Sequence, residues 1–518
     1  MIDEKSSAGG IRAPAECLLS DNDEILENRQ HITAIRATMP AMSSKTKTTV
    51  QESASPTVPT QYDVERHAAN DVVLEDQSQL VEYLASGCKS RPEWRLGAEQ
   101  EQFAYVGEPL RPAHYETGIR VLLESMRDAG WWPVEENGLP IALTRGGASI
   151  TLEPGGQVEY SSAPFISVHD IDQETATYLQ ELRHAAGDCG LKFLAMGHQP
   201  LHPRSDISWM PKRRYQIMQE WMPRQGNGGL DMMQSTAAMQ MTVDFSDEPD
   251  MVRKFRVALA LQPIAEALFA NSPYSLGRKT GSVSHRSKIW SETDPQRCGT
   301  LPFVFEDGMG FERYAEYVLD VPMYFVHRND QYIDASGCSF RDFLVGELSV
   351  LPGEKPRVSD WVNHLTTVFP QVRMKTFLEL RGADAGDAQR RMPALCALWA
   401  GILYHDESLA EACERVTNWS ADDFAALQDA ARLGFRTPFR NETVRELAAW
   451  MLHLSRNGLR HRNFQNDQGE DESRFLTPLD EAVESGRTFA EQLVDRVQSE
   501  WNGDVAAALP HLCEETWQ

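Results

Sequence analysis

Leu96-Gly-Ala-Glu-Gln-Glu-Gln-Phe103 is the segment that decides the fold of this 518-residue chain. Successive side chains of a β-strand point to opposite faces, so Glu99 and Glu101 share one face, about 7 Å apart. Two carboxylates at that separation repel one another unless cations lie between them. The spacing predicts a strand whose polar face binds Mg²⁺, with substrate phosphates completing the coordination. A solvated strand face is the alternative.

Three further segments combine alternating apolar residues with acidic, amide or basic side chains. They are Ile150–Tyr160, Met239–Phe245 and Phe377–Arg381. Their polar positions are Glu153, Glu159, Gln240, Thr242, Asp244, Glu379 and Arg381. The recurrence leads to the hypothesis of one sheet whose polar face is a reaction floor with several metal-binding carboxylates.

Two clusters of basic residues are candidate anion ligands. Arg213 and Arg214 precede Tyr215, and the segment His285–Trp290 is followed by Arg297. The planar guanidinium group of arginine suits bidentate capture of a carboxylate or a phosphate. The alternative is a surface role, in which basic side chains cover apolar neighbours.

The order of helical and strand patterns predicts an α+β fold, with helices packed on an antiparallel or mixed sheet, because no regular βαβ rhythm is present. Helical spacing occurs over residues 76–88, 119–130, 171–187 and 251–269. Period-two alternation occurs over residues 150–153, 157–160, 191–196, 239–245 and 377–381. The C-terminal part is mostly helical, and Thr477 is the predicted N-cap of one helix. Gly226, Gly228 and Gly229 predict a mobile loop.

Composition separates two regions and excludes some classes of function. Residues 1–61 contain no Phe, Trp or Tyr, which predicts a disordered leader, and residues 62–518 form a single predicted domain. The formal net charge of −26 argues against nucleic acid as a partner. No apolar run is long enough to cross a membrane. Eight cysteines without a CxxC motif fit reduced thiols, so we expect a cytoplasmic protein.

Long stretches of the chain resemble the plant-type glutamate–cysteine ligases of plants and proteobacteria, which make γ-glutamylcysteine for glutathione synthesis. The stretches include GAEQEQF, LEPGGQVEYS, MPKRRYQIM, LPFVFEDGMGFERY and NHLTTVFPQVRMKTFLELRGAD. They keep their order and spacing from about residue 62 to the C-terminus. The resemblance implies a glutamine-synthetase-like carboxylate-amine ligase core, in which a curved antiparallel sheet carries helices on its outer face.

The resemblance also implies roles for individual residues. The implied Mg²⁺ ligands are Glu99, Glu101, Glu153, Glu159 and Glu379. The implied catalytic residues are Arg286, Arg297, Glu379 and Arg381. The implied substrate-binding residues are Arg214, Tyr215, Gln240, Thr242, Trp290 and Tyr324. Plant members have Asn at the position of Thr242, so the polar contacts there differ from the family pattern.

The implied reaction is the ATP-dependent ligation of the γ-carboxylate of L-glutamate to L-cysteine through a γ-glutamyl phosphate. Mg²⁺ and arginine would neutralise the transferring phosphoryl group. Three alternatives stay open: a γ-glutamyl ligase for another amine, a phosphotransferase to guanidino substrates, and a non-catalytic regulatory protein. The expected partners are small molecules, namely glutamate, cysteine and ATP. Nucleic acid and membrane are not expected partners, and a monomer is favoured over a homodimer.

Overall fold

The segment around Glu99 lies in the middle of a ten-stranded sheet in the computed structural model, which describes residues 71–516. The strands of this sheet are β1 (Leu96–Val106), β2 (Arg111–Pro112), β3 (Trp132–Glu136), β4 (Leu139–Arg145), β5 (Ala148–Leu152), β6 (Val158–Ser161), β7 (Leu191–Leu194), β8 (Ala238–Val243), β15 (Val372–Met374) and β16 (Leu378–Asp384). Their order is β15-β16-β8-β1-β6-β5-β4-β3, and β2 and β7 also pair with β1. Every pairing is antiparallel.

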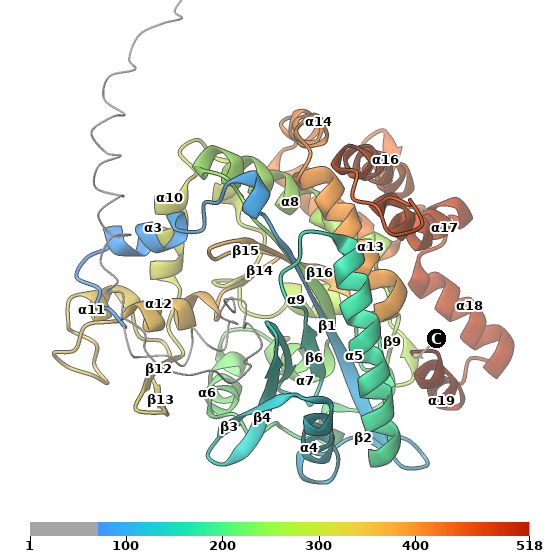
Figure 1. The fold of residues 1–518 in the computed structure, drawn as a ribbon, viewed down its shortest axis with the longest axis horizontal. Helices are drawn as coiled ribbons and strands as arrows, with labels where there is room; N and C mark the ends of the chain where they lie inside the picture. Colours follow the sequence, from blue (N-terminus) through green and yellow to red (C-terminus); the bar gives the residue numbers. More distant parts are fainter. Residues whose placement is uncertain (1–70, 517–518) are drawn as a thin grey trace, which may run out of the picture. The chain divides into compact units, whose positions relative to one another are not determined.

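Helices and short strand pairs surround this sheet (Figure 1). The α-helices are α3 (Ser78–Ala85), α4 (Arg120–Met126), α5 (Val168–Cys189), α6 (Arg213–Trp221), α7 (Gly229–Ser235), α8 (Glu248–Leu268), α9 (His285–Ser291), α10 (Phe311–Asp320), α11 (Phe340–Leu344), α12 (Val358–Leu365), α13 (Ala388–Leu403), α14 (Asp406–Val416), α15 (Ala421–Leu433), α16 (Val444–Arg462), α17 (Thr477–Ser485), α18 (Phe489–Trp501) and α19 (Val505–Glu515). The two-stranded pairs join β9 (Tyr274–Ser275) to β10 (Arg278–Lys279), β11 (Cys298–Gly299) to β14 (Phe369–Pro370), β12 (Phe325–Arg328) to β13 (Gln331–Asp334), and β17 (Pro438–Phe439) to β18 (Glu442–Thr443).

One face of the central sheet is apolar and covered by helices. Leu96 and Ala98 of β1 and Met241 of β8 are fully or almost fully buried on this face. Helix α13 packs on β1 and β8, α8 packs on β16, and α5 packs on β1 and α13. In Figure 1, α5 lies in front of the sheet and runs roughly along β1. The alternation of apolar and polar residues in the sequence therefore determines which face of the sheet packs in the core. The predicted α+β fold class is confirmed.

The described residues belong to one unit that spans Thr57–Gln518. The predicted leader, residues 1–61, lies outside the described residues, as does the beginning of the predicted domain. Among the helices of residues 71–516, none combines the length and the hydropathy that a membrane span needs.

Local details differ from the sequence predictions at three places. Helix α5 continues through Gly187 and ends at Gly190, whose left-handed φ of 65° suits glycine. Thr477 is the first residue of α17 and not its N-cap, because its own backbone is already helical. The cluster that begins at Gly226 is no open loop: a Cβ on Gly226 would lie 1.6 Å from the Thr293 carbonyl oxygen.

Helices α13 and α16 cross at two glycines. A Cβ built on Gly458 would lie 1.8 Å from the carbonyl oxygen of Gly401, and one built on Gly401 would lie 2.2 Å from that of Ser455. Because the obstructing atoms belong to backbones, a larger residue forces the helices apart. The crossing therefore fixes how the C-terminal helices sit on the layer that covers the sheet.

Gly458→Ala is expected to lower the free energy of unfolding by about 1–3 kcal/mol, since it overpacks this crossing. Gly187→Ala, inside α5 with no atom within 4 Å of the added Cβ, is the matched control and should raise that free energy by about 0.5–1 kcal/mol. Urea unfolding of both variants measures the difference. Equal effects of the two substitutions would contradict the close crossing.

Candidate active site

The register of the strands gathers acidic side chains on the face opposite the helical layer. Glu101 of β1 pairs with Glu159 of β6, and Glu99 pairs with Gln240 of β8. Glu379 of β16 pairs with Thr242 on the other edge of β8. Directly opposed residues of antiparallel strands point to the same face. The carboxylates predicted from three separate segments, with Gln240 and Thr242 from a fourth, therefore lie on one face of the sheet, the floor, with Glu153 at its border just after β5.

Hydrogen bonds from neighbouring strands hold the floor carboxylates in place. Glu101 accepts bonds from the backbone N–H of Ala238, at 3.1 Å, and from Nε2 of Gln240, at 3.3 Å. Glu159 accepts a bond from the hydroxyl of Thr151, at 2.5 Å. These contacts orient the carboxylates but add no positive charge.

Burial and mutual repulsion disfavour the ionised form of these carboxyl groups. Burial, with a further contribution from Glu379, raises the pKa of Glu99 to about 7. Burial, followed by the charge of Glu153, raises the pKa of Glu101 to about 8. The pKa of Glu159 is raised well above its ordinary value by burial and by the neighbouring glutamates. Lys375 and Arg381 oppose the shift at Glu99, and Arg286 opposes it at Glu101, but burial and the neighbouring carboxylates outweigh these cations.

The chemistry of this donor set fits a hard divalent cation. Mg²⁺ prefers carboxylate and amide oxygens and usually retains sites for substrate phosphates. The floor offers both donor types, and a bound cation would relieve the repulsion that raises the pKa values of its glutamates. Glu101 lies directly opposite Glu159, and Glu99 and Glu153 act electrostatically on Glu159; the role of these four glutamates as metal ligands stays a prediction.

Glu379 has a different environment, because three basic residues surround it. Arg373 donates two bonds to its carboxylate, at 2.7 and 3.0 Å, and Lys375 lies at 3.3 Å. Arg381 contacts the same carboxylate from the adjacent floor position. Burial alone would raise the pKa of Glu379, but the three cations hold it well below its ordinary value. In this structure Glu379 holds three basic side chains in place by ion pairs. Its role as a metal ligand stays a prediction.

Arg373 and Lys375 are site residues that the sequence reasoning missed. They occupy alternate positions of β15 and its continuation, and β15 pairs with β16 so that Arg373 lies opposite Glu379. The alternation Arg-Met-Lys, four residues before Glu379, is a signal that was present in the sequence. The pairing of the two segments was not visible there, because it depends on the turn between β15 and β16.

Arg286 and Arg381 lie together at the end of the floor. Arg286 is buried and donates to the carbonyl oxygens of Arg381, at 2.7 Å, and Gly382, at 3.0 Å. Arg381 donates to Oε1 of Gln240, at 2.5 Å. Thr242 accepts a bond from the backbone N–H of Gly97, at 3.1 Å. Hydrogen bonds through Gln240 of β8 and the backbone of β16 therefore link the carboxylates of the floor to the guanidinium groups of Arg381 and Arg286.

Arg297 and Tyr324 are not brought to the floor. Arg297 is fully buried and donates to Asp294, to the Thr367 carbonyl and to the Pro322 carbonyl, at 2.7, 3.0 and 2.8 Å. Its guanidinium lies 4.0 Å from the ring centroid of the buried Tyr324. The structure gives this pair a packing role and does not support the catalytic and substrate contacts expected from the sequence.

Arg214, Tyr215 and Trp290 come from helices next to the floor. Tyr215 of α6 donates to the Leu152 carbonyl, at 2.6 Å, and its hydroxyl lies 3.4 Å from Glu153. Arg214 contacts the Thr366 hydroxyl, at 3.1 Å. The ring of Trp290 in α9 lies 5.9 Å from the guanidinium carbon of Arg286. Of the three, Tyr215 reaches the carboxylates most directly.

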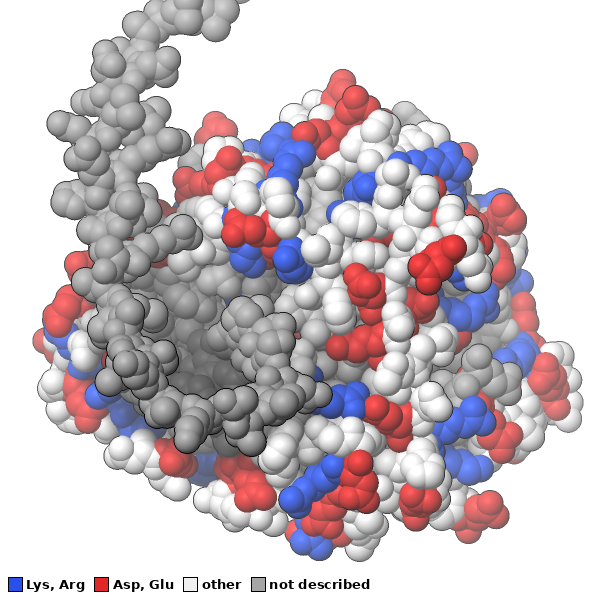
Figure 2. Space-filling view, viewed as in Figure 1, with Lys and Arg blue, Asp and Glu red and all other residues white. Residues whose placement is uncertain are grey.

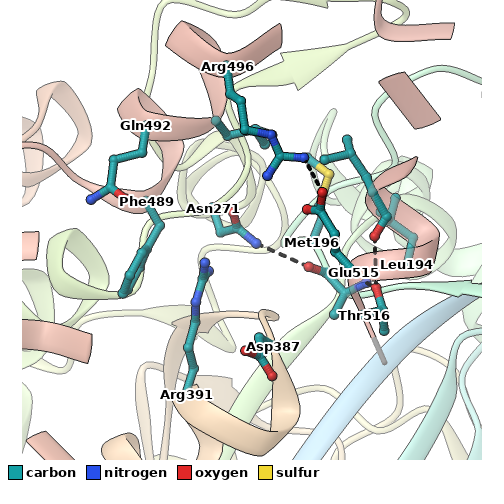
Figure 3. Close-up of a pocket in the computed structure, with 13 residues that line it drawn as sticks. Leu194, Met196, Asn271, Asp387, Arg391, Phe489, Gln492, Arg496, Glu515 and Thr516 are labelled. Carbon is teal, nitrogen blue, oxygen red and sulfur yellow. Dashed lines mark hydrogen bonds and ion pairs between the residues drawn. The ribbon is translucent and has the colours of Figure 1, made fainter. Parts of the chain in front are cut away.

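Another cavity, of about 220 Å³, lies apart from this floor (Figure 3). Residues of α13, α18, α19 and β7 line it, and no floor carboxylate is among them. Figure 2 shows acidic and basic side chains intermixed on one face of the molecule, without a broad basic area among the coloured residues. Neither feature competes with the floor as the candidate site.

Comparison with known proteins assigns the chain to a family of ligases. Residues 95–511 match the family described as Glutamate-cysteine ligase family 2 (GCS2). The chain is 47% identical to the chloroplastic glutamate–cysteine ligase B of Oryza sativa subsp. japonica over 439 residues, covering 84% of this chain and 87% of that protein. It is 44% identical to the chloroplastic enzyme of Arabidopsis thaliana over 437 residues, covering 84% and 82%. The resemblance seen in the sequence motifs is confirmed.

A solved structure is also similar. It is the crystal structure of glutamate–cysteine ligase from Francisella tularensis in complex with AMP, with 11% identity and a TM-score of 0.48, covering 82% of this chain and 88% of that chain.

The predicted cytoplasmic location is wrong by these comparisons. The relatives from Oryza sativa, Medicago truncatula and Arabidopsis thaliana that match most of the chain are all chloroplastic. The prediction rested on charge and cysteine spacing. These features indicate possible partners and redox chemistry, but they do not specify a cellular compartment.

The raised pKa values predict how stability depends on pH without divalent cations. Between the ordinary carboxyl pKa of 4.5 and the folded values of about 7 for Glu99 and about 8 for Glu101, the folded state binds more protons than the unfolded state. The contribution of these two groups to the free energy of unfolding should therefore fall as pH rises from 5 to 8, by up to about 1.4 kcal/mol per pH unit for each group. Glu379, with its lowered pKa, affects stability only at lower pH.

Urea unfolding in EDTA at several pH values measures this slope. Added Mg²⁺ should flatten it, and so should Glu101→Gln, which removes one of the titrating groups. Because the buried His198 and His364, with lowered pKa values, add stability as pH rises, the comparison with Glu101→Gln is decisive. A slope of the metal-free wild type equal to that of Glu101→Gln between pH 5 and 8 would contradict the electrostatic description of the floor.

Proposed function

Because this chain belongs to the glutamate-cysteine ligase family 2, we propose that it joins the γ-carboxylate of L-glutamate to the amine of L-cysteine with ATP. The products are γ-glutamylcysteine, ADP and phosphate, which is the first step of glutathione biosynthesis. The observation that carries the proposal is the identity of 44–47% with glutamate–cysteine ligases over most of the chain. The acidic floor supplies the physical basis for a phosphoryl transfer.

The reaction requires activation of the glutamate side chain, because a carboxylate has no good leaving group. A γ-carboxylate oxygen of glutamate attacks the terminal phosphorus of ATP, and ADP leaves. The cysteine amine then attacks the acyl carbon, phosphate leaves, and the amine nitrogen loses its proton. Catalysis of both steps rests on positioning and on charge stabilisation.

We assign the binding of Mg²⁺ and the ATP phosphates to the floor. Glu99, Glu101, Glu153 and Glu159 would hold Mg²⁺, which supplies neutralisation of phosphate charge when bound. Gln240 lies between Glu101 and Arg381. Its amide nitrogen donates to Glu101 and its amide oxygen accepts from Arg381, so these bonds fix the orientations of the Gln240 amide and the Arg381 guanidinium. Arg381, held by Glu379, presents its charge beside the carboxylates.

The glutamate site is assigned to the neighbouring helices. Arg214 offers a guanidinium for a carboxylate of the substrate, and Tyr215 and Trp290 form pocket walls. Arg286, buried under the bulge of β16, orients the Arg381 backbone by donating a hydrogen bond to its carbonyl oxygen. Glu379 with Arg373 and Lys375 keeps this end of the floor rigid.

Glu101→Gln should lower kcat by at least about 100-fold with the fold retained, because the amide cannot supply a carboxylate charge to the cation. Glu124→Gln, at an exposed position of α4, is the control and should leave turnover unchanged. Coupled measurement of ADP and γ-glutamylcysteine gives both values. Near-normal turnover of Glu101→Gln would refute the assignment of the floor.

The acyl phosphate route predicts the fate of the glutamate oxygen. Glutamate labelled with ¹⁸O in its γ-carboxylate should transfer one labelled oxygen to each phosphate released, as read by mass spectrometry. Dipeptide formed with unlabelled phosphate would exclude the γ-glutamyl phosphate but keep the ligase. Labelled phosphate released only with an amine other than cysteine would identify a different acceptor.

A further inference from the structure

We propose that His405, Glu407 and His461 form a Zn²⁺ site separate from the acidic floor. The possible metal-binding atoms of the three side chains lie within 4.8 Å of one another. His405 caps the N-terminus of α14, Glu407 lies in its first turn, and His461 lies in the last turn of α16. These two helices pack against each other at the edge of the helical layer (Figure 1).

The close helix crossing places the two imidazoles side by side. A Cβ built on Gly458 would lie 2.9 Å from the Cβ of His405 and 1.8 Å from the carbonyl oxygen of Gly401, so α16 approaches the end of α13 very closely. His461 lies one turn beyond Gly458 on the same helix. The two rings stack with their centroids 4.4 Å apart and their planes at 23°. A rigid backbone contact thus supports the pair.

The hydrogen bond at Nδ1 leaves the Nε2 atom of His461 available as a ligand, and a neighbouring hydroxyl lets His405 adopt the same tautomer. Nδ1 of His461 lies 3.1 Å from the carbonyl oxygen of Asn457, which can only accept, so Nδ1 carries the proton. Nδ1 of His405 accepts a bond from the backbone N–H of Ser408, at 3.3 Å, where it caps α14, and lies 2.9 Å from the Ser408 hydroxyl. That hydroxyl donates to the Leu454 carbonyl and can accept a hydrogen bond from a protonated Nδ1, so binding of a metal at Nε2 exchanges the capping bond for a bond from Nδ1 to the hydroxyl.

Two imidazole nitrogens and one carboxylate are a donor set typical of Zn²⁺ with one position left for water. Two ligand atoms on a tetrahedral zinc lie about 3.4 Å apart, so a small rotation of the exposed Glu407 and His461 completes the geometry. The hydrogen bond from Nδ1 of His461 to the Asn457 carbonyl is the kind of outer contact that orients a histidine ligand. A hard cation such as Mg²⁺ would favour the all-oxygen floor instead.

Equilibrium dialysis of the full chain against Zn²⁺, with excess Mg²⁺ to occupy the floor, tests the site. Wild-type protein should bind one more Zn²⁺ than either His461→Ala or Glu407→Gln, and its Tm should rise with Zn²⁺ while theirs does not. His184→Ala removes an exposed histidine that also has a carboxylate neighbour, Asp188 at 3.7 Å, and should behave as wild type. Equal Zn²⁺ binding by wild type and both site variants would overturn the proposal.

Two further readouts separate loss of the site from loss of the fold. Both substituted residues are exposed, so metal-free Tm and activity with Mg²⁺ should match the wild type. Co²⁺ in place of Zn²⁺ should give the visible absorption of a four-coordinate ion in wild type and not in the variants. A six-coordinate Co²⁺ spectrum in the wild-type protein would contradict the three-residue site.

Discussion

Repulsion among the carboxylates of β1 and β6 is the constraint on which the rest of this structure depends. Glu101 lies directly opposite Glu159 and shares its face with Glu99, where burial favours the protonated forms. A fold that only had to be stable would avoid this arrangement. The sheet retains it because the opposite face buries an apolar surface against α5, α8 and α13. Stability on one face thus supports an unfavourable charge distribution on the other, which a divalent cation would relieve.

The basic residues around Glu379 set the second half of the site. Arg373, Lys375 and Arg381 share one carboxylate, so a cationic end of the floor adjoins an acidic end. An anionic substrate bound across the floor meets positive charge at one side and metal ligands at the other. This separation suits a reaction in which a phosphoryl group passes from ATP to a carboxylate.

Much of the floor was predictable from the sequence, because period-two alternation assigns each residue of a strand to a face. Glu99, Glu101 and Glu159 follow from that rule alone. The rule says nothing about depth or pairing, so it could not show that Arg297 points into the core or that Arg373 lies opposite Glu379. Long-range pairing also decides the crossing of α13 and α16, where the glycines carry no periodic signal. Residues whose roles depend on one strand were predicted better than those whose roles depend on two distant segments.

A crystal structure with Mn²⁺ and a non-hydrolysable ATP analogue would test the central claim most directly, since anomalous scattering locates each Mn²⁺ ion. The account predicts peaks within bonding distance of the carboxylates of Glu99, Glu101 and Glu159, with the phosphates of the analogue completing the coordination. Peaks confined to other parts of the molecule, with these carboxylates bonded only to protein or water beside a bound nucleotide, would contradict it.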